Sequence, residues 1–546
     1  MKPIGIGIDD FKELIEMNGF YVDKTKFIED IVKDISKVQL ITRPRRFGKT
    51  LNMSMLKYFY DINDRDKNKK LFNGLYIENS PTFEERGKYP VIFLSFKDIK
   101  EDTVEKMFIK IGNLIKGLYN SFNYLRENLN PSDLMDFDNI WLMKDESNLS
   151  NSLLNLSRYL KEFYNEEVIL LLDEYDTPII SAYEYGYYDE IKNFFISMYG
   201  SVLKGNPSLK KAVLTGIMRI SKENIFSGLN NIKVNSILDE NFSQYFGLTE
   251  EEVEEALKDY EIEYRLDEIQ TWYNGYNFGG TRVYNPFSIT SYLDRKKIMP
   301  YWVNTSSNTL INKVLREAGN SIFNDLSKLF QGEIIEKTID VYSNFNELRN
   351  SEQIWYLLAN SGYLTPVKEI DYDKYSLKIP NEEVHSFFER DFIKSFLGGK
   401  DNFDNLLKYL LDGNLEDFSY ELENILLINT SCFDFSANAS EGYYHVFILG
   451  MILALRREYF IHSNRESGRG RYDILLEPKD KNKLGLIIEF KAPKEKENLE
   501  KECKEALKQI EDKKYEVELK ERGIKKILLV GMAFYKRDFK IIGKVI

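Results

Sequence analysis

The fold of this chain follows from one stretch, residues 43–50, which reads Arg-Pro-Arg-Arg-Phe-Gly-Lys-Thr. An apolar run at 38–41 precedes it, and a helix-like run follows it. A strand, a tight loop ending in Gly-Lys-Thr and then a helix form the layout of a phosphate-binding loop. In such a loop Gly48 lets the main chain approach the phosphates, Lys49 reaches the β- and γ-phosphates, and the Thr50 hydroxyl holds Mg²⁺.

The stretch departs from the general motif at its first position, where Arg43 replaces the usual glycine. Arg43 and Arg46 are candidate nucleotide-binding residues because both place a cation in the loop. Gly-Lys-Thr in a basic loop also occurs by chance, so the motif needs a supporting context.

A second motif supplies that context. Residues 168–172 form a continuous apolar run, as expected of a strand buried on both faces, and Asp173 and Glu174 end it. Nucleotide-hydrolysing sites place a Mg²⁺ contact and a water-activating carboxylate at such a strand end. Asp173 is therefore the candidate Mg²⁺ ligand and Glu174 the candidate general base. The alternative is a solvated loop, which the pairing with residues 43–50 disfavours.

Further strands are expected at 89–96 and 211–216, alternating with helices at 102–125 and 149–164. This alternation predicts an α/β fold with a parallel sheet covered on both faces. Thr215, at the tip of a strand, can contact the γ-phosphate or the attacking water. Arg219 can neutralise charge in phosphoryl transfer, or it is an ordinary surface arginine. The first 37 residues either cover the nucleotide base or form a docking helix pair.

Several of these motifs together resemble the bacterial AAA-ATPase-like family, namely residues 21–25 (YVDKT), 43–50, 172–176 (LDEYD) and 214–216 (LTG). Residues 272–276 and 284–286 also look like that family. The resemblance implies ATP and Mg²⁺ as cofactors and a C-terminal nuclease-like domain. Arg43 belongs to the family's own form of the loop, which leaves nucleotide binding without turnover as an open alternative.

The middle of the chain is expected to be helical and accessory. Residues 249–252 (TEEE) form a capping box, and a helix at 354–361 closes at Gly362. The two short strands expected at 367–369 and 375–379 complete a winged-helix-like pattern. Its acidic flanks favour a lid over a DNA-binding role.

A second candidate site lies on two strands, at 469–476 and 484–491. Glu489 and Lys491 are two residues apart and share one face of their strand, and a hairpin brings Asp473 near them. Asp473 and Glu489 can bind Mg²⁺, while Lys491 activates a water and stabilises developing charge. The alternative is a solvated hairpin with a surface charge pair, which the apolar run 486–488 disfavours.

These positions resemble the core of the PD-(D/E)xK nuclease superfamily, with Asp473, Glu489 and Lys491 as its signature residues. In this resemblance Glu441 matches an additional acidic metal-site position on the preceding helix, and Gln509 matches a further site residue. His445 is interpreted as a helix residue and not as a ligand. The resemblance implies a restriction-endonuclease-like α/β domain.

Length and composition limit the remaining choices. The 546 residues suggest several domains, expected at 1–246, 247–380 and 381–546. The net charge of −12 means that DNA or RNA binding requires a local basic patch. Two cysteines argue against a disulfide framework or a cysteine-rich zinc site. The absence of a signal-peptide core or long apolar stretch predicts a cytoplasmic protein without a membrane partner.

The leading interpretation is an ATPase fused to a Mg²⁺-dependent nuclease that acts on DNA or RNA, with the ATP state gating access or assembly. One alternative is a nucleotide-dependent switch whose C-terminal domain binds DNA or a protein partner without cleavage. Another is an ATPase without nuclease chemistry, used in defence or signalling. The sequence leaves the oligomeric state open.

Overall fold

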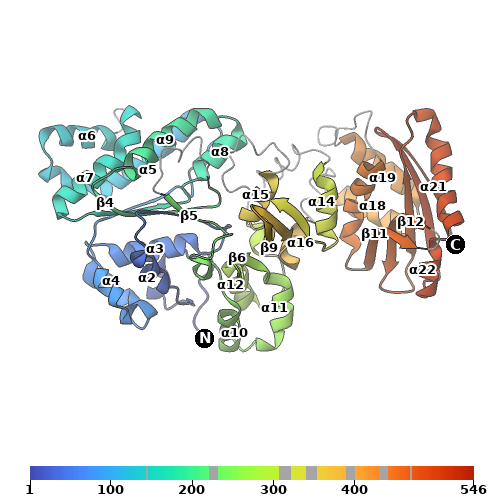
Figure 1. Ribbon diagram of the computed structural model, residues 1–546, viewed down its shortest axis with the longest axis horizontal. Coiled ribbons are helices and arrows are strands. Elements are labelled where there is room, and N and C mark those ends of the chain that lie inside the picture. Colours follow the sequence, from blue (N-terminus) through green and yellow to red (C-terminus); the bar gives the residue numbers. More distant parts are fainter. Residues whose placement is uncertain are drawn as a thin grey trace. The chain divides into compact units, whose positions relative to one another are not determined.

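The computed structural model describes residues 1–142, 146–219, 232–305, 321–339, 353–388, 400–428, 441–467 and 470–546 (Figure 1). The chain forms two compact units. Unit 1 contains Met1–Val314 and Glu336–Glu383, and unit 2 contains Leu315–Ile335 and Val384–Ile546. The predicted domain boundary at 246 lies inside unit 1 and stays a prediction.

A five-stranded parallel sheet organises the first part of unit 1, in the order β2-β3-β4-β1-β5. Its strands are β1 (Val38–Thr42), β2 (Val91–Ser95), β3 (Val168–Asp173), β4 (Leu209–Gly216) and β5 (Ile232–Asn235). Every residue of β1 and β3 is buried, which confirms the expected sheet covered on both faces. Strand β5 was not expected because its four residues form no continuous apolar run.

Helices cover both faces of this sheet (Figure 1). One group consists of α1 (Phe11–Glu16), α2 (Lys26–Lys33), α3 (Lys49–Tyr60) and α4 (Arg65–Lys69). The other consists of α5 (Val104–Ser121), α6 (Pro131–Trp141), α7 (Ser152–Tyr164), α8 (Thr177–Tyr185) and α9 (Tyr188–Leu203). Local signals set their ends: Thr103 caps α5, and Asn130 caps α6 ahead of Pro131.

The middle of the chain is largely helical, as expected. It contains α10 (Glu250–Asp259), α11 (Leu266–Tyr273), α12 (Pro286–Arg295) and α15 (Gln353–Asn360), with the hairpin β6 (Tyr276–Phe278) and β7 (Thr281–Val283). The predicted capping box at Thr249 is present, and Gly362 has φ 85° just beyond α15. The expected hairpin forms β9 (Thr365–Asp371) and β10 (Lys374–Lys378), joined by β8 (Ile335–Thr338) in the order β8-β10-β9.

Unit 2 is built on a mixed sheet in the order β11-β12-β13-β14-β15. Its strands are β11 (Tyr459–Ser467), β12 (Gly470–Pro478), β13 (Gly485–Lys491), β14 (Ile527–Tyr535) and β15 (Asp538–Val545). Only β13 and β14 pair in parallel, and the other neighbours are antiparallel. The predicted hairpin of β12 and β13 is therefore confirmed.

The helices that accompany this sheet are α14 (Ser321–Phe330), α18 (Lys400–Leu411), α19 (Leu415–Ile428), α20 (Glu441–Ile452), α21 (Leu499–Lys513) and α22 (Glu516–Glu521). Helix α16 (Glu382–Phe387) precedes residues 389–399, which lie outside the described part of the chain. Gly531 on β14 lets α21 pack closely, because a Cβ there would lie 2.5 Å from the Cys503 carbonyl oxygen. Among the described residues, no helix is both long and apolar enough to span a bilayer.

Candidate nucleotide and metal sites

A cavity of about 390 Å³ lies where β1, β2 and β3 end. The loop 45–50 forms one part of its wall, Lys97 and Glu174 another. Residues of the N-terminal segment, including Ile8 and Tyr21, line it as well. Ligands of open α/β sheets bind at such carboxyl ends of the strands, so the sheet places this cavity where a nucleotide is expected.

The loop between β1 and α3 has the backbone that a phosphate cradle needs. Gly48 has φ 80° and Arg46 has φ 68°, both in the left-handed region. Lys49 is buried, and its Nζ donates to the main-chain oxygens of Arg43 at 3.1 Å and Pro44 at 2.8 Å. Burial lowers the pKa of Lys49, while Glu174, Asp173 and Asp176 oppose that shift. The Lys49 ammonium thus hydrogen-bonds to two carbonyl oxygens of its own loop. Phosphate oxygens of a ligand could replace these two acceptors.

The structure brings the predicted Mg²⁺ residues together. Thr50 Oγ1 donates to Asp173 Oδ2 at 2.8 Å, and Thr215 Oγ1 donates to Asp173 Oδ1 at 2.6 Å. Ser95 at the end of β2, which the sequence analysis missed, lies 3.3 Å from Asp173 Oδ2. Burial raises the pKa of Asp173, and the hydroxyls of Thr215 and Thr50 oppose the shift. This cluster of hydroxyl and carboxylate oxygens fits a hard cation such as Mg²⁺.

Within the described ranges, no cluster of three or more His, Cys, Asp or Glu side chains is placed to hold a metal. A cation at Thr50 and Asp173 would therefore need ligand phosphates to complete its shell, as Mg²⁺ commonly does in nucleotide sites. Glu174 lines the cavity and has φ 51°, an uncommon conformation for a residue other than glycine. Its Oε2 accepts a hydrogen bond from Thr177 Oγ1 at 3.1 Å. The predicted base is thus held at the cavity wall.

Arg43 differs from its predicted role as a direct nucleotide ligand. Its side chain is fully buried, and the guanidinium donates to the main-chain oxygens of Thr42, Asn235 and Asn241 at 2.8, 2.9 and 3.2 Å. The rings of Phe246 and Phe278 lie 5.6 and 5.2 Å from its central carbon. Burial lowers the pKa of Arg43 to about 9, so the group stays charged at neutral pH. Its partners enclose the side chain, which leaves only the main-chain oxygen to contact Lys49.

Two other arginines of the loop do line the cavity. Arg46, a predicted ligand, lies over the Phe287 ring at 4.9 Å. Arg45, which the sequence analysis did not single out, also lines the cavity, and its guanidinium forms no ion pair within the described residues. Its place in the same loop was the available signal. Among the described residues, Arg45 is thus a cation of the cavity wall that has no ion-pair partner.

Thr215 lies near the end of β4 and Arg219 lies just beyond that strand, and only Thr215 reaches the candidate nucleotide site. Thr215 reaches the site through Asp173, whereas Arg219 is absent from the cavity wall. The main-chain nitrogen of Arg219 donates to Tyr356 Oη at 3.2 Å. Asp176 holds this turn by accepting from the nitrogens of Ile217 and Met218 at 2.8 and 2.9 Å. The phosphoryl-transfer role suggested for Arg219 stays a prediction.

In unit 2, the antiparallel register of Ile474 with Ile488 places Asp473 opposite Glu489. Asp473 Oδ2 accepts from the Phe490 main-chain nitrogen at 2.8 Å, and Lys491 Nζ lies 3.6 Å from Glu489 Oε1. Glu489 is only 3% exposed, which excludes the solvated hairpin. Burial raises the pKa of Asp473, opposed by the Phe490 N–H and by Lys491.

Three further residues surround this carboxylate pair. Gln509 on α21 donates to Glu489 Oε1, as its predicted place near the site requires. Glu441 begins α20, but its side chain lies outside the described part of the chain. His445 Nε2 lies 3.1 Å from the Asp473 carbonyl oxygen and 2.9 Å from Ser463 Oγ. His445 therefore supports Asp473 through the main chain, in agreement with its interpretation as a helix residue.

The first unit has the sheet and loop of a nucleotide-binding domain, and the second has the carboxylate–lysine hairpin of a nuclease-like domain. Residues 5–226 match the family described as Predicted AAA-ATPase, and residues 439–544 match the PD-(D/E)XK nuclease superfamily. The chain thus combines domains of these two families, which confirms both resemblances. It is also similar to a protein described as "Uncharacterized protein in vnfD 5'region" from Azotobacter chroococcum mcd 1, with 26% identity over 559 residues that cover 100% of this chain and 99% of that protein.

Proposed function

We propose that unit 1 binds ATP with Mg²⁺ and hydrolyses it, and that the domain at 439–544 is a Mg²⁺-dependent nuclease acting on DNA or RNA. The observation that carries the first part is the meeting of Thr50, Asp173 and Thr215 beside Lys49 and Glu174. These side chains come from the ends of two strands, β3 and β4, and from the start of helix α3.

In the nucleotide cavity, Lys49 leaves the carbonyls of Arg43 and Pro44 and binds the β- and γ-phosphates. Thr50 and Asp173 hold the metal ion, which neutralises phosphate charge when bound. Glu174 accepts the proton of the attacking water as the bond from the γ-phosphorus to the bridging oxygen breaks. Arg45 offers a second cation to the phosphates. The apolar side chains of the N-terminal segment enclose the base.

In the second site, Asp473 and Glu489 hold the metal ion, which stabilises charge on the scissile phosphate when bound. Lys491 orients a water for attack on phosphorus, and the phosphodiester P–O bond on the opposite side breaks. The meeting of two carboxylates and an ammonium on this hairpin supports this proposal, because carboxylate oxygens are ligands that Mg²⁺ prefers.

The alternative function is a nucleotide-dependent switch whose C-terminal domain binds DNA or a protein partner without cleaving it. One observation favours it. Asp473 accepts a main-chain hydrogen bond, and Glu489 Oε1 has Gln509 and Lys491 as protein partners.

The test uses supercoiled, linear and single-stranded nucleic acids with Mg²⁺ or Mn²⁺, with and without ATP. Cleavage that requires metal and is lost in Asp473→Ala supports the nuclease. An ATP effect that is lost in Lys49→Ala couples the two sites. Nucleotide binding without cleavage on any substrate would establish the switch instead.

A further inference from the structure

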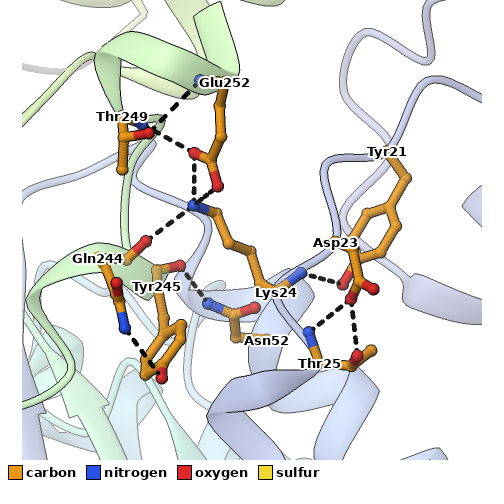
Figure 2. Close-up of polar contacts among 9 residues, drawn as sticks. All are labelled: Tyr21, Asp23, Lys24, Thr25, Asn52, Gln244, Tyr245, Thr249 and Glu252. Carbon is orange, nitrogen blue, oxygen red and sulfur yellow. Dashed lines mark hydrogen bonds and ion pairs between the residues drawn. The ribbon is translucent and has the colours of Figure 1, made fainter. Parts of the chain in front are cut away.

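Lys24 is a buried lysine in the wall of the nucleotide cavity. It is 8% exposed, and it belongs to the YVDKT motif whose function is not explained by phosphate chemistry. Its Nζ donates to both carboxylate oxygens of Glu252 at 2.6 Å and to the Gln244 main-chain oxygen at 2.8 Å (Figure 2). Burial lowers the pKa of Lys24, and the Glu252 carboxylate opposes that shift.

Glu252 also forms the capping box at the start of α10. It is the third residue of α10, and its Oε2 accepts from the Thr249 main-chain nitrogen at 2.8 Å, while Thr249 Oγ1 accepts from the Glu252 nitrogen at 3.4 Å (Figure 2). One carboxylate therefore caps α10 and holds Lys24. The position of the helix start is tied to the N-terminal segment, 228 residues earlier in the chain.

A second tie joins the same region to the phosphate loop. Asn52 lies three residues after Lys49 on α3, and its Nδ2 donates to the Tyr245 main-chain oxygen at 2.9 Å. Asn52 and Tyr245 line the cavity, and so do Gly247 and Leu248. The segment 244–252, which lines the cavity with Tyr245, Gly247 and Leu248, is thus bonded to Lys24 and to Asn52, from two different parts of the chain.

The segment that carries Lys24 is itself fixed. Asp23 Oδ1 accepts from the Thr25 nitrogen at 2.8 Å and from Thr25 Oγ1 at 2.6 Å, and Tyr21 Oη accepts from the Lys24 nitrogen at 3.2 Å (Figure 2). These hydrogen bonds fix the main chain on either side of Lys24, so the position from which its side chain reaches Glu252 is well defined. Although the Lys24 ammonium borders the cavity, it makes three hydrogen bonds to Glu252 and Gln244 of segment 244–252.

We propose that Lys24 is a positioning residue of the nucleotide cavity, which holds residues 244–252 in place through its ion pair with Glu252. This inference rests on the proposed nucleotide function of unit 1. Affinity for ATP then depends on the ion pair and not on a direct contact between Lys24 and the nucleotide. Removing either partner leaves a buried charge uncompensated and removes the ion pair that holds residues 244–252 in place.

Three substitutions in the full chain separate the possibilities. Glu252→Gln keeps a residue that can complete the capping box but removes the charge. Lys24→Met removes the cation and keeps the length of the side chain. Thr249→Ala removes the cap hydroxyl and leaves the ion pair intact, so it is the matched control for the stability of α10.

The measurements are ATP affinity with a fluorescent ATP analogue and hydrogen exchange of residues 244–252 without nucleotide. We expect Lys24→Met and Glu252→Gln each to weaken binding about tenfold or more, and the double variant to be no weaker than either, because both remove one interaction. Exchange in 244–252 should accelerate in both single variants. Thr249→Ala should stay within about threefold of the wild-type affinity, since its cap contributes modestly.

Two results would overturn the proposal. Weak binding in Lys24→Met with unchanged or tighter binding in Glu252→Gln would mean that Lys24 contacts the nucleotide directly. Equal losses in Thr249→Ala and Glu252→Gln would mean that only the stability of α10 matters. A wild-type chain that binds no nucleotide would remove the proposed function, while the exchange measurement would still show whether the ion pair holds 244–252.

Discussion

Replacing Arg43 by glycine would restore the general phosphate-loop motif, yet we expect it to damage the site. Arg46 and Gly48 have positive φ, whereas Arg43 is not among the residues with positive φ, so its backbone does not require glycine. Its side chain instead joins the loop to residues 235 and 241 and to two aromatic rings. The substitution therefore removes the buried contacts of Arg43 with residues 235, 241, 246 and 278, here called the Arg43 clamp, and relieves no backbone strain.

The magnitude follows from the contacts that are lost. Three main-chain carbonyls lose their donor, and a buried polar group without a partner costs about 1–3 kcal/mol. Each lost cation–π contact adds about 0.5–2 kcal/mol. Water entering this polar space would restore part of the hydrogen bonding. Because water offsets part of the loss, we expect the free energy of unfolding to fall by about 3–5 kcal/mol, near the low end of the sum of these terms.

Calorimetry of the full chain and titration with ATP provide the assay. A loss of this size should lower the unfolding temperature of unit 1 by about 4–7 °C. ATP affinity should fall about tenfold or more because Lys49 donates to the Arg43 carbonyl oxygen. Arg43→Lys keeps the charge without the planar fork and should fall between glycine and the wild type. A glycine variant with the wild-type unfolding temperature and equal or tighter ATP binding would show that the Arg43 side chain does not stabilise the loop.

The other predictions concern the two candidate sites and one buried carboxylate of unit 1, Glu383. Glu174→Gln should keep ATP affinity within about threefold and lower turnover at least about 100-fold, measured by phosphate release; lost binding would contradict its role as a base. Burial raises the pKa of Glu383 from 4.5 to about 7. Because the unfolded chain ionises first, urea unfolding should show stability falling by up to about 3 kcal/mol as pH rises from 4.5 to 7. Glu383→Gln should remove this slope, and an unchanged slope would assign it to other groups. His445→Ala should raise the Mg²⁺ concentration needed for half-maximal cleavage about tenfold by loosening Asp473, and an unaltered metal dependence would count against that support.

Local pattern was enough for much of the fold and of both candidate sites. The apolar runs at 38–41 and 168–172 are strands β1 and β3, because a continuous apolar run of that length is stable only when buried on both faces. Strand-end carboxylates could be assigned from the same pattern, since a parallel sheet brings the carboxyl ends together. Glu489 and Lys491 share a face because side chains alternate along a strand.

Other features left no local signal. Strands β5, β11 and β15 contain polar residues and depend on pairing with neighbours for their existence. Arg45 and Arg46 are adjacent and chemically alike to Arg43, so the sequence could not show which guanidinium is buried. The choice depends on carbonyls of residues 235 and 241, which lie almost 200 positions later.

The sequence by itself determined where the two candidate sites lie, because Gly48-Lys49-Thr50, the acidic end of β3 and the Glu489–Lys491 spacing are each patterns of a few residues. Only the tertiary structure decided that Arg43 is a clamp, that Arg45 lines the cavity and that Lys24 holds Glu252. These roles arise from contacts between segments far apart in the chain. Burial gives such contacts their energy, and burial is a property of the packed molecule.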